Sequence, residues 1–226
     1  HRFEDKSRLL RIISAFIILI FFTIYCASGM VAGARLFEET FGLSYNVSLW
    51  AGAAATIIYV FIGGFLAVSW TDTVQATLMI FALILAPVMV INSVGGFDSS
   101  LQLIQSLNPK YMDLFNGTTF VGIISLLAWG LGYMGQPHIL ARFMAAENYS
   151  TIKKAKWIGM TWMILCLIGA LSIGFFGIAY FAQHPDLAGA VNANNEKIFI
   201  SLTQILFNPW VAGILLSAVL SAVMST

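Results

Sequence analysis

Charged side chains are scarce in this sequence of 226 residues: Asp, Glu, Lys and Arg together make up 9% of it, whereas hydrophobic residues make up 59%. Soluble domains carry about 25% charged residues. A soluble fold of this length cannot bury so much apolar surface, and the mean hydropathy of +0.88 agrees with that conclusion. The composition therefore excludes a soluble domain and predicts an all-α polytopic membrane protein.

Groups for covalent, metal or redox chemistry are also few. The two cysteines, Cys26 and Cys166, lie inside apolar runs, where free Cys is a common buried hydrophobe. The three histidines form no Cys/His cluster with the spacing of metal ligands. The sequence contains no nucleophile–base pair, no phosphate-binding loop and no basic tract. We therefore expect neither an enzyme nor a nucleic-acid-binding protein, and we infer no cofactor and no obligate protein partner.

Long apolar runs are what the sequence has in abundance. A helix that crosses the bilayer needs about 20 mainly apolar residues. Such spans must be helical here, because hydrocarbon offers no partner for unpaired backbone groups and a barrel would show short alternating strands. We expect one transmembrane domain over residues 1–226, with spans near 10–34, 48–69, 74–96, 119–137, 157–182 and 208–226.

Positive residues are distributed unevenly over the segments between these spans. Eight Lys and Arg residues fall on one side, together with the connection between the second and third spans, and three fall on the other. The positive-inside rule places the side with eight in the cytoplasm. The eight are Arg2, Lys6, Arg8, Arg11, Arg142, Lys153, Lys154 and Lys156, and the three are Arg35, Lys110 and Lys197.

The second and third spans are separated by the polar residues Thr71-Asp72-Thr73, which predict a tight membrane hairpin. An ionisable residue beside a span is a functional candidate. Asp72 can equally accept backbone N–H groups as the N-cap of the third span, where the helix dipole favours negative charge. The two interpretations are compatible, and both place Asp72 in a turn.

The fourth span contains a stretch that does not suit a continuous helix. Three glycines and Pro137 lie within eight residues, and they weaken the backbone hydrogen bonding. Unwound backbone at membrane depth is tolerated where it lines a cavity, and transporters use it to bind ions and zwitterions. Trp129 and Tyr133 are four residues apart and share a helix face. They are either the aromatic walls of a binding site or part of a packing kink.

Two further groups of residues can likewise belong either to a binding site or to a helix-packing face. Tyr25 lies among small residues in the first span, where it suits close helix packing or a hydroxyl that faces a cavity. The last apolar run is rich in hydroxyls, which together with a helical carbonyl are suitable ligands for an alkali cation. Ser217 and Ser221 are four residues apart in that run, so a helix-packing face is the alternative.

These features together resemble the sodium:solute symporter family, over essentially all 226 residues. The matching motifs are Gly42 and Tyr45 to Tyr59, Gly63-Gly64-Phe65 with Ala67, Thr71 to Gln75, Gly132-Tyr133 to Arg142, and Ile205 to Trp210. The resemblance implies a LeuT-like fold of two inverted five-helix repeats. The six spans would be core helices three to eight, so that the sequence would be a piece without the first, ninth and tenth.

The resemblance also implies a function and a set of site residues. The function would be sodium-coupled secondary active uptake of L-proline by alternating access, in the bacterial inner membrane. The implied substrate-side residues are Tyr25, Trp129, Tyr133 and Pro137. The implied sodium ligands are the Ala222 carbonyl and the hydroxyls of Ser225 and Thr226, with Asp72 on the inward sodium route. The alternatives are a symporter of the same family for pantothenate or a short organic acid, and a symporter-like membrane sensor module.

Overall fold

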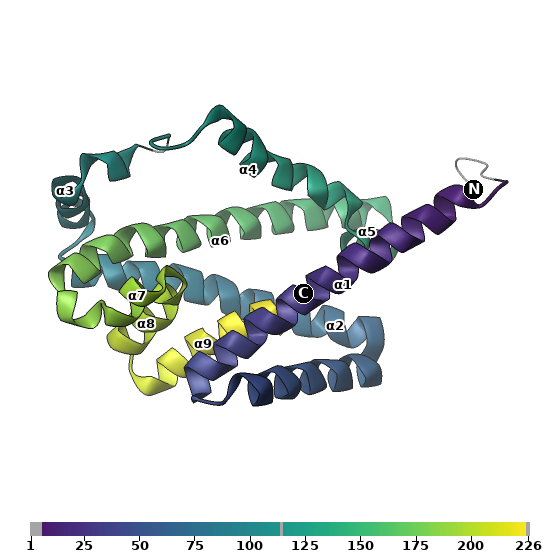
Figure 1. The fold of residues 1–226 in the computed structure, drawn as a ribbon, viewed down its shortest axis with the longest axis horizontal. Helices are drawn as coiled ribbons and strands as arrows, with labels where there is room; N and C mark the ends of the chain where they lie inside the picture. The colour runs from purple at the N-terminus through teal and green to yellow at the C-terminus, as the bar shows by residue number, and fades with distance from the viewer. Residues whose placement is uncertain (1–5, 114, 225–226) are drawn as a thin grey trace. The chain divides into compact units, whose positions relative to one another are not determined.

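The computed structural model describes residues 6–113 and 115–224, and every regular element within these ranges is helical (Figure 1). The predicted all-α class is therefore confirmed. The chain divides into two compact units, one formed by Ile80–Gly213 and the other by the residues up to Met79 together with those from Ile214. Helices α2 and α9 cross from one unit to the other. The helices are α1 (Leu9–Phe41), α2 (Tyr45–Ser93), α3 (Phe97–Leu107), α4 (Phe120–Gly132), α5 (Pro137–Met144), α6 (Tyr149–Gln183), α7 (Gly189–Ala193), α8 (Ile198–Leu206) and α9 (Pro209–Met224), with short 3₁₀ turns η1 (Pro109–Met112), η2 (Tyr133–Gly135), η3 (Pro185–Leu187) and η4 (Asn195–Lys197).

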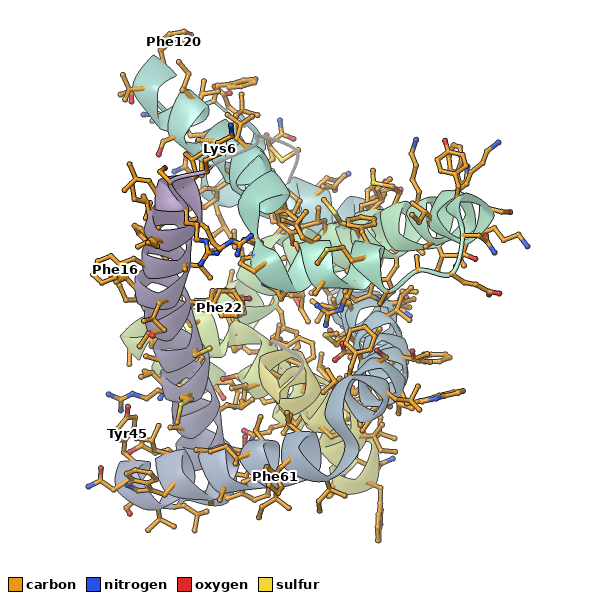
Figure 2. All side chains as sticks on the ribbon, turned by 90° about the vertical axis from the view of Figure 1, so that its right-hand side faces the viewer. Lys6, Phe16, Phe22, Tyr45, Phe61 and Phe120 are labelled. Carbon is orange, nitrogen blue, oxygen red and sulfur yellow. The ribbon has the colours of Figure 1, made fainter. Side chains whose placement is uncertain are left out.

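Helix α1 presents apolar side chains on nearly all sides. Phe16 is 64% exposed and points away from the helix, as does Phe61 of α2, which is 90% exposed (Figure 2). The helix ends at Phe41 and is capped by Gly42, whose φ of 66° places it in the left-handed region and whose N–H donates to the Glu38 carbonyl at 2.9 Å. A glycine in this conformation is the usual helix terminator. A helix with so apolar a surface needs lipid or other apolar segments around it.

Helix α2 reverses direction in its first half. Gly64 has φ 54° and ψ −150°, a conformation that only glycine adopts readily, and the helices on either side of it run in opposite directions (Figure 1). The two segments form a helical hairpin, but its turn lies at Gly63–Gly64 rather than at the predicted position. The glycine pair permits the turn because no side chain obstructs the backbone there.

The predicted turn at Thr71-Asp72-Thr73 is wrong, because these residues lie inside the helix that follows Gly64. The hydroxyls form hydrogen bonds within that helix: Thr71 Oγ1 donates to the Ala67 carbonyl at 3.0 Å, and Thr73 Oγ1 donates to the Ser69 carbonyl at 2.9 Å. Hydroxyl side chains that bond to the carbonyl four residues earlier are tolerated in helices. The N-cap interpretation of Asp72 is wrong for the same reason.

The unit Ile80–Gly213 contains a well-packed apolar cluster. Helix α6 begins after Asn148, whose Oδ1 accepts from the Thr151 N–H at 2.9 Å, and its second half contacts α3 and α8. Ile104 of α3 and Leu202 of α8 are at most 1% exposed. The cluster consists of Ala86, Val90, Val94, Ile104, Ile173, Phe176, Ala179, Tyr180, Phe181, Ala188, Val191 and Leu202.

Three of the described helical segments are long and apolar enough to cross a membrane: Leu9–Glu38, Val60–Ser93 and Tyr149–Gln183. A shorter apolar helix covers Pro209–Val219. The remaining predicted spans lie near the first half of α2 and near α4. The full set of six spans, the single domain and the orientation in the bilayer stay predictions.

Candidate functional site

The fourth predicted span is broken, as its glycines and proline led us to expect. Helix α4 ends at Gly132, the 3₁₀ turn η2 covers Tyr133–Gly135, and α5 begins at Pro137. Gln136 between them is extended, with φ −79° and ψ 118°. A residue before proline is disfavoured in the helical region, so Pro137 accounts for this conformation. Gln136 was not among the predicted site residues, although the proline after it was the available signal.

The break changes the pattern of backbone hydrogen bonds at a defined place. Pro137 has no N–H, so the Tyr133 carbonyl lacks its usual donor four residues later. The Gln136 N–H instead donates to that carbonyl at 3.4 Å, which is a long bond. The Gln136 carbonyl accepts from the N–H groups of Ile139 and Leu140, at 3.2 and 3.1 Å. Such weakly bonded backbone is suited to bind the charged groups of a ligand.

The candidate substrate-side residues of this unit are arranged around that break. Tyr133 begins η2 and its side chain is 40% exposed, which leaves the ring accessible. Pro137 begins α5 and is half-buried. Trp129 belongs to α4, three residues before its end, and its side chain lies outside the described part of the structure. The three residues are thus carried by one interrupted helix.

Tyr25, the other candidate on the substrate side, lies in the middle of α1. Its ring stacks on that of Phe22, with centroids 5.7 Å apart and an angle of 30° between the planes. The side chain is 36% exposed. Because one face of the ring is held by Phe22, the phenol has a restricted orientation on the surface of α1.

Asp72 lies in the α2 half that follows Gly64. Its side chain is half-buried and its Oδ1 atom is shielded from solvent. Gln75, three residues later on the same side of the helix, also has a shielded side-chain oxygen, Oε1. A carboxylate and an amide oxygen therefore lie close together along one helix, although both belong to its interior and neither to a turn.

The candidate sodium ligands belong to the C-terminal helix. Ala222 is part of α9, while Ser225 and Thr226 lie outside the described residues. Earlier in α9 the Ser217 hydroxyl donates to the Ile214 carbonyl at 2.6 Å, so this hydroxyl is used within its own helix. Tyr25, Asp72 and Ala222 belong to one compact unit, and Tyr133 and Pro137 belong to the other.

Comparisons with known proteins agree with these features. The model of the sodium:solute symporter family matches residues 1–226. The chain is 72% identical over 225 residues to the sodium/proline symporter of Escherichia coli, 59% identical over 230 residues to that of Haemophilus influenzae, and 48% identical over 226 residues to the high-affinity proline transporter PutP of Bacillus subtilis. All of this chain is covered in each case, but only 45%, 46% and 47% of the relatives. No solved structure matches it.

The long apolar helices and their exposed apolar surfaces indicate a multi-pass α-helical membrane protein. Because the family model covers the whole sequence, the chain belongs to the sodium:solute symporter family. It spans a little less than half the length of the curated relatives that it matches. Helical multi-pass proteins of bacteria reside in the cytoplasmic membrane, whereas outer-membrane proteins are barrels.

Proposed function

We propose that the protein to which this chain belongs takes up L-proline by symport with sodium, through alternating access. The observation that carries the proposal is the 72% identity, over the whole chain, to a sodium/proline symporter. At 48% identity the relative from Bacillus subtilis is also a proline transporter. The relatives thus keep the same solute while half of the sequence changes, which favours L-proline over other small solutes.

The fold that we propose is the LeuT-like arrangement of two inverted five-helix repeats. In it, α1 would be core helix three, the halves of α2 before and after Gly64 would be four and five, and α4 with η2 and α5 would be six. Helix α6 would be core helix seven and α9 core helix eight. The broken helix supports this proposal, because discontinuous helices at the membrane midplane are characteristic of such transporters.

The substrate site would combine the break in the fourth span with aromatic side chains. Trp129 and Tyr133 would flank the pyrrolidine ring of L-proline, and the irregular backbone near Pro137 would bind its zwitterionic groups. Tyr25 of α1 would be a further substrate-side residue. A ring of apolar CH₂ groups suits aromatic walls, and charged groups suit open backbone and a phenol hydroxyl.

The sodium site would use neutral oxygen ligands. The Ala222 carbonyl and the hydroxyls of Ser225 and Thr226 would supply part of the coordination shell, and Asp72 would lie on the route by which the ion leaves toward the cytoplasm. Hard oxygen ligands suit a hard alkali cation. Neutral ligands hold it weakly enough for release on each transport cycle.

Coupling would follow from ordering of the broken backbone. Sodium binding would stabilise the conformation that binds proline, and proline binding would in turn raise the affinity for sodium by the same factor. Such coupling free energies are typically about 1–3 kcal/mol. The membrane potential adds about 2.3 kcal/mol per charge per 100 mV, which drives the inward direction of a sodium-coupled step.

Uptake of radiolabelled L-proline into proteoliposomes tests the proposal. The protein is reconstituted with an inward sodium gradient, without one, and with a proton gradient in its place. We expect accumulation only with sodium, and its loss when excess unlabelled L-proline is added. If pantothenate or a short organic acid competes and unlabelled L-proline does not, the competing compound is the transported solute in place of L-proline. No sodium-dependent uptake of any of these solutes would overturn symport and favour a sensor module.

A further inference from the structure

Helix α6 and the second half of α2 approach each other very closely at one point. A methyl group added to Gly169 of α6 would lie 2.8 Å from the Cβ atom and 2.9 Å from the carbonyl carbon of Leu83 in α2, and it would overlap the Leu83 carbonyl oxygen. Ordinary van der Waals contacts are 3.4–4 Å long. The α6 backbone therefore lies directly against the α2 backbone, and glycine is the only residue that fits without movement.

The Leu83 carbonyl at this contact is unusual within its own helix. In a regular helix it accepts from the N–H four residues later, but that residue is Pro87, which is buried within α2 and has no N–H. A carbonyl without a donor is costly in an apolar environment. The Cα–H groups of a closely packed glycine give such an oxygen a weak but favourable contact. Pro87 and Gly169 thus complement each other across the two helices.

The chain after Pro87, to the end of α2 and the turn residue that follows it, makes separate contacts with α6. Val90 is fully buried and Val94 is 5% exposed, and both belong to the cluster that includes Ile173 and Phe176 of α6. The Gln183 side chain near the end of α6 also donates to the Val94 carbonyl at 3.5 Å. Two separate contacts with α6 therefore hold α2, one before and one after the proline where its hydrogen-bond ladder is interrupted.

We propose that α2 bends at Pro87 and that Gly169 is the positioning residue that fixes the angle of this bend. Prolines are the common site of sharp helix kinks, because the lost hydrogen bond and the ring weaken the helix at that point. The cluster around Val90 would hold one arm of the kink, and the glycine contact at Leu83 would set the angle of the other. The transport cycle would proceed at its full rate only at one defined bend angle.

Gly169→Ala tests the proposal, with Gly174→Ala as the matched control. Both glycines lie in α6, but a methyl group at Gly174 meets nothing within 4 Å. Spin labels at Ile84→Cys and Ile168→Cys, in the full chain with the native cysteines replaced by serine, report the distance between the helices. We expect Gly169→Ala to lengthen that distance by about 1 Å, which restores ordinary contact, and Gly174→Ala to leave it unchanged.

Uptake provides a readout that a purely structural role would not change in the same way. A displaced kink slows the conformational step, so Gly169→Ala should lower the maximal uptake rate per folded molecule several-fold at unchanged KM for L-proline. The uptake readout rests on the proposed function, whereas the label distance does not. Failure of the positioning role of Gly169 can therefore be distinguished from failure of the proposed function. A label distance that is the same in Gly169→Ala and Gly174→Ala would overturn the proposal.

Pro87→Ala provides a second test that adds no bulk and remains available if Gly169→Ala does not fold. The new N–H gives the Leu83 carbonyl a donor within α2, so the kink should straighten and the same label distance should shift. The effect of Gly169→Ala on this distance should also differ according to whether Pro87→Ala is present, because the two residues act on one carbonyl. An unchanged distance in Pro87→Ala, or strictly additive shifts, would contradict the pairing.

Discussion

The broken helix formed by α4, η2 and α5 and the second half of α6 differ in how their residues are used. The second half of α6 contributes buried residues such as Ile173, Phe176 and Ala179 to an apolar cluster. The break between Gly132 and Pro137 has none that is fully buried among its described residues, and its Gln136 N–H reaches the Tyr133 carbonyl only over a long 3.4 Å. The second half of α6 and the broken helix thus differ in packing. Residues of α6 stabilise the protein, whereas residues at the break are available for ligands.

The largest effect that we expect on stability is that of Phe176→Ala. Phe176 is 6% exposed and packs against the rings of Phe97 and Phe175, with centroids 5.5 and 5.2 Å away. Truncating a buried Phe costs about 3–5 kcal/mol through lost contacts and the cavity that remains. Phe120→Ala in α4, where Phe120 is 77% exposed, is the control and should cost little. Thermal unfolding in detergent measures both, and equal losses would contradict the comparison.

Ser225→Ala and Thr226→Ala should have the next largest effect. They should change the sodium dependence of uptake rather than folding. Hydrogen-bonding or ligating groups that act on an ion contribute about 1.5–3 kcal/mol each, so the half-saturating sodium concentration should rise roughly 10- to 100-fold. Ser217→Ala is the control, since its hydroxyl bonds to the Ile214 carbonyl of its own helix. Sodium dependence of uptake is the measurement. An unchanged sodium requirement would refute the assignment of these ligands.

Gly64→Ala should have an intermediate effect, on the hairpin of α2. A residue with a Cβ atom is strained at the φ of 54° and ψ of −150° of Gly64, at a cost of about 1–3 kcal/mol. Gly29→Ala in α1 is the control, because Gly29 has no positive φ and an added methyl group meets nothing within 4 Å. A lower midpoint of thermal unfolding for Gly64→Ala alone is expected. Identical midpoints would mean that the turn lies elsewhere.

Tyr133→Phe should have the smallest effect of the four, because it removes a single hydroxyl. The loss of one hydrogen bond to the substrate amounts to about 0.5–1.5 kcal/mol, or roughly two- to tenfold in proline affinity, with unfolding unchanged. Tyr149→Phe, at an 80% exposed position at the start of α6, serves as the control. Proline binding to the purified protein is the measurement. If only the amount of folded protein falls, Tyr133 has a packing role instead.

The features that the sequence predicted correctly are those with a local cause. The helical class follows from the long apolar runs, and the break near Pro137 follows from the glycines and the missing N–H of proline. The hairpin turn was misplaced because Thr71 and Thr73 were interpreted as loop residues. Their hydroxyls bond to carbonyls of their own helix, so their polarity gave no indication of a turn.

Features that depend on packing between distant segments were not predictable in the same way. The contact of Gly169 with Leu83 joins residues 86 positions apart, and the cluster around Phe176 draws on α2, α3, α6, α7 and α8. A single sequence indicates which residues are apolar but does not indicate which helices meet. The roles of Tyr25, Trp129 and Asp72 came from the family resemblance, and they stay predictions.

The most direct test of the account is the affinity of the purified full-length protein for L-proline, measured as the sodium concentration is varied. If sodium orders the broken backbone, proline affinity should rise about 5- to 150-fold between sodium-free and sodium-saturated protein. The affinity for sodium should rise by the same factor when proline is present. Proline binding that is independent of sodium would contradict the coupling at the centre of the proposed function.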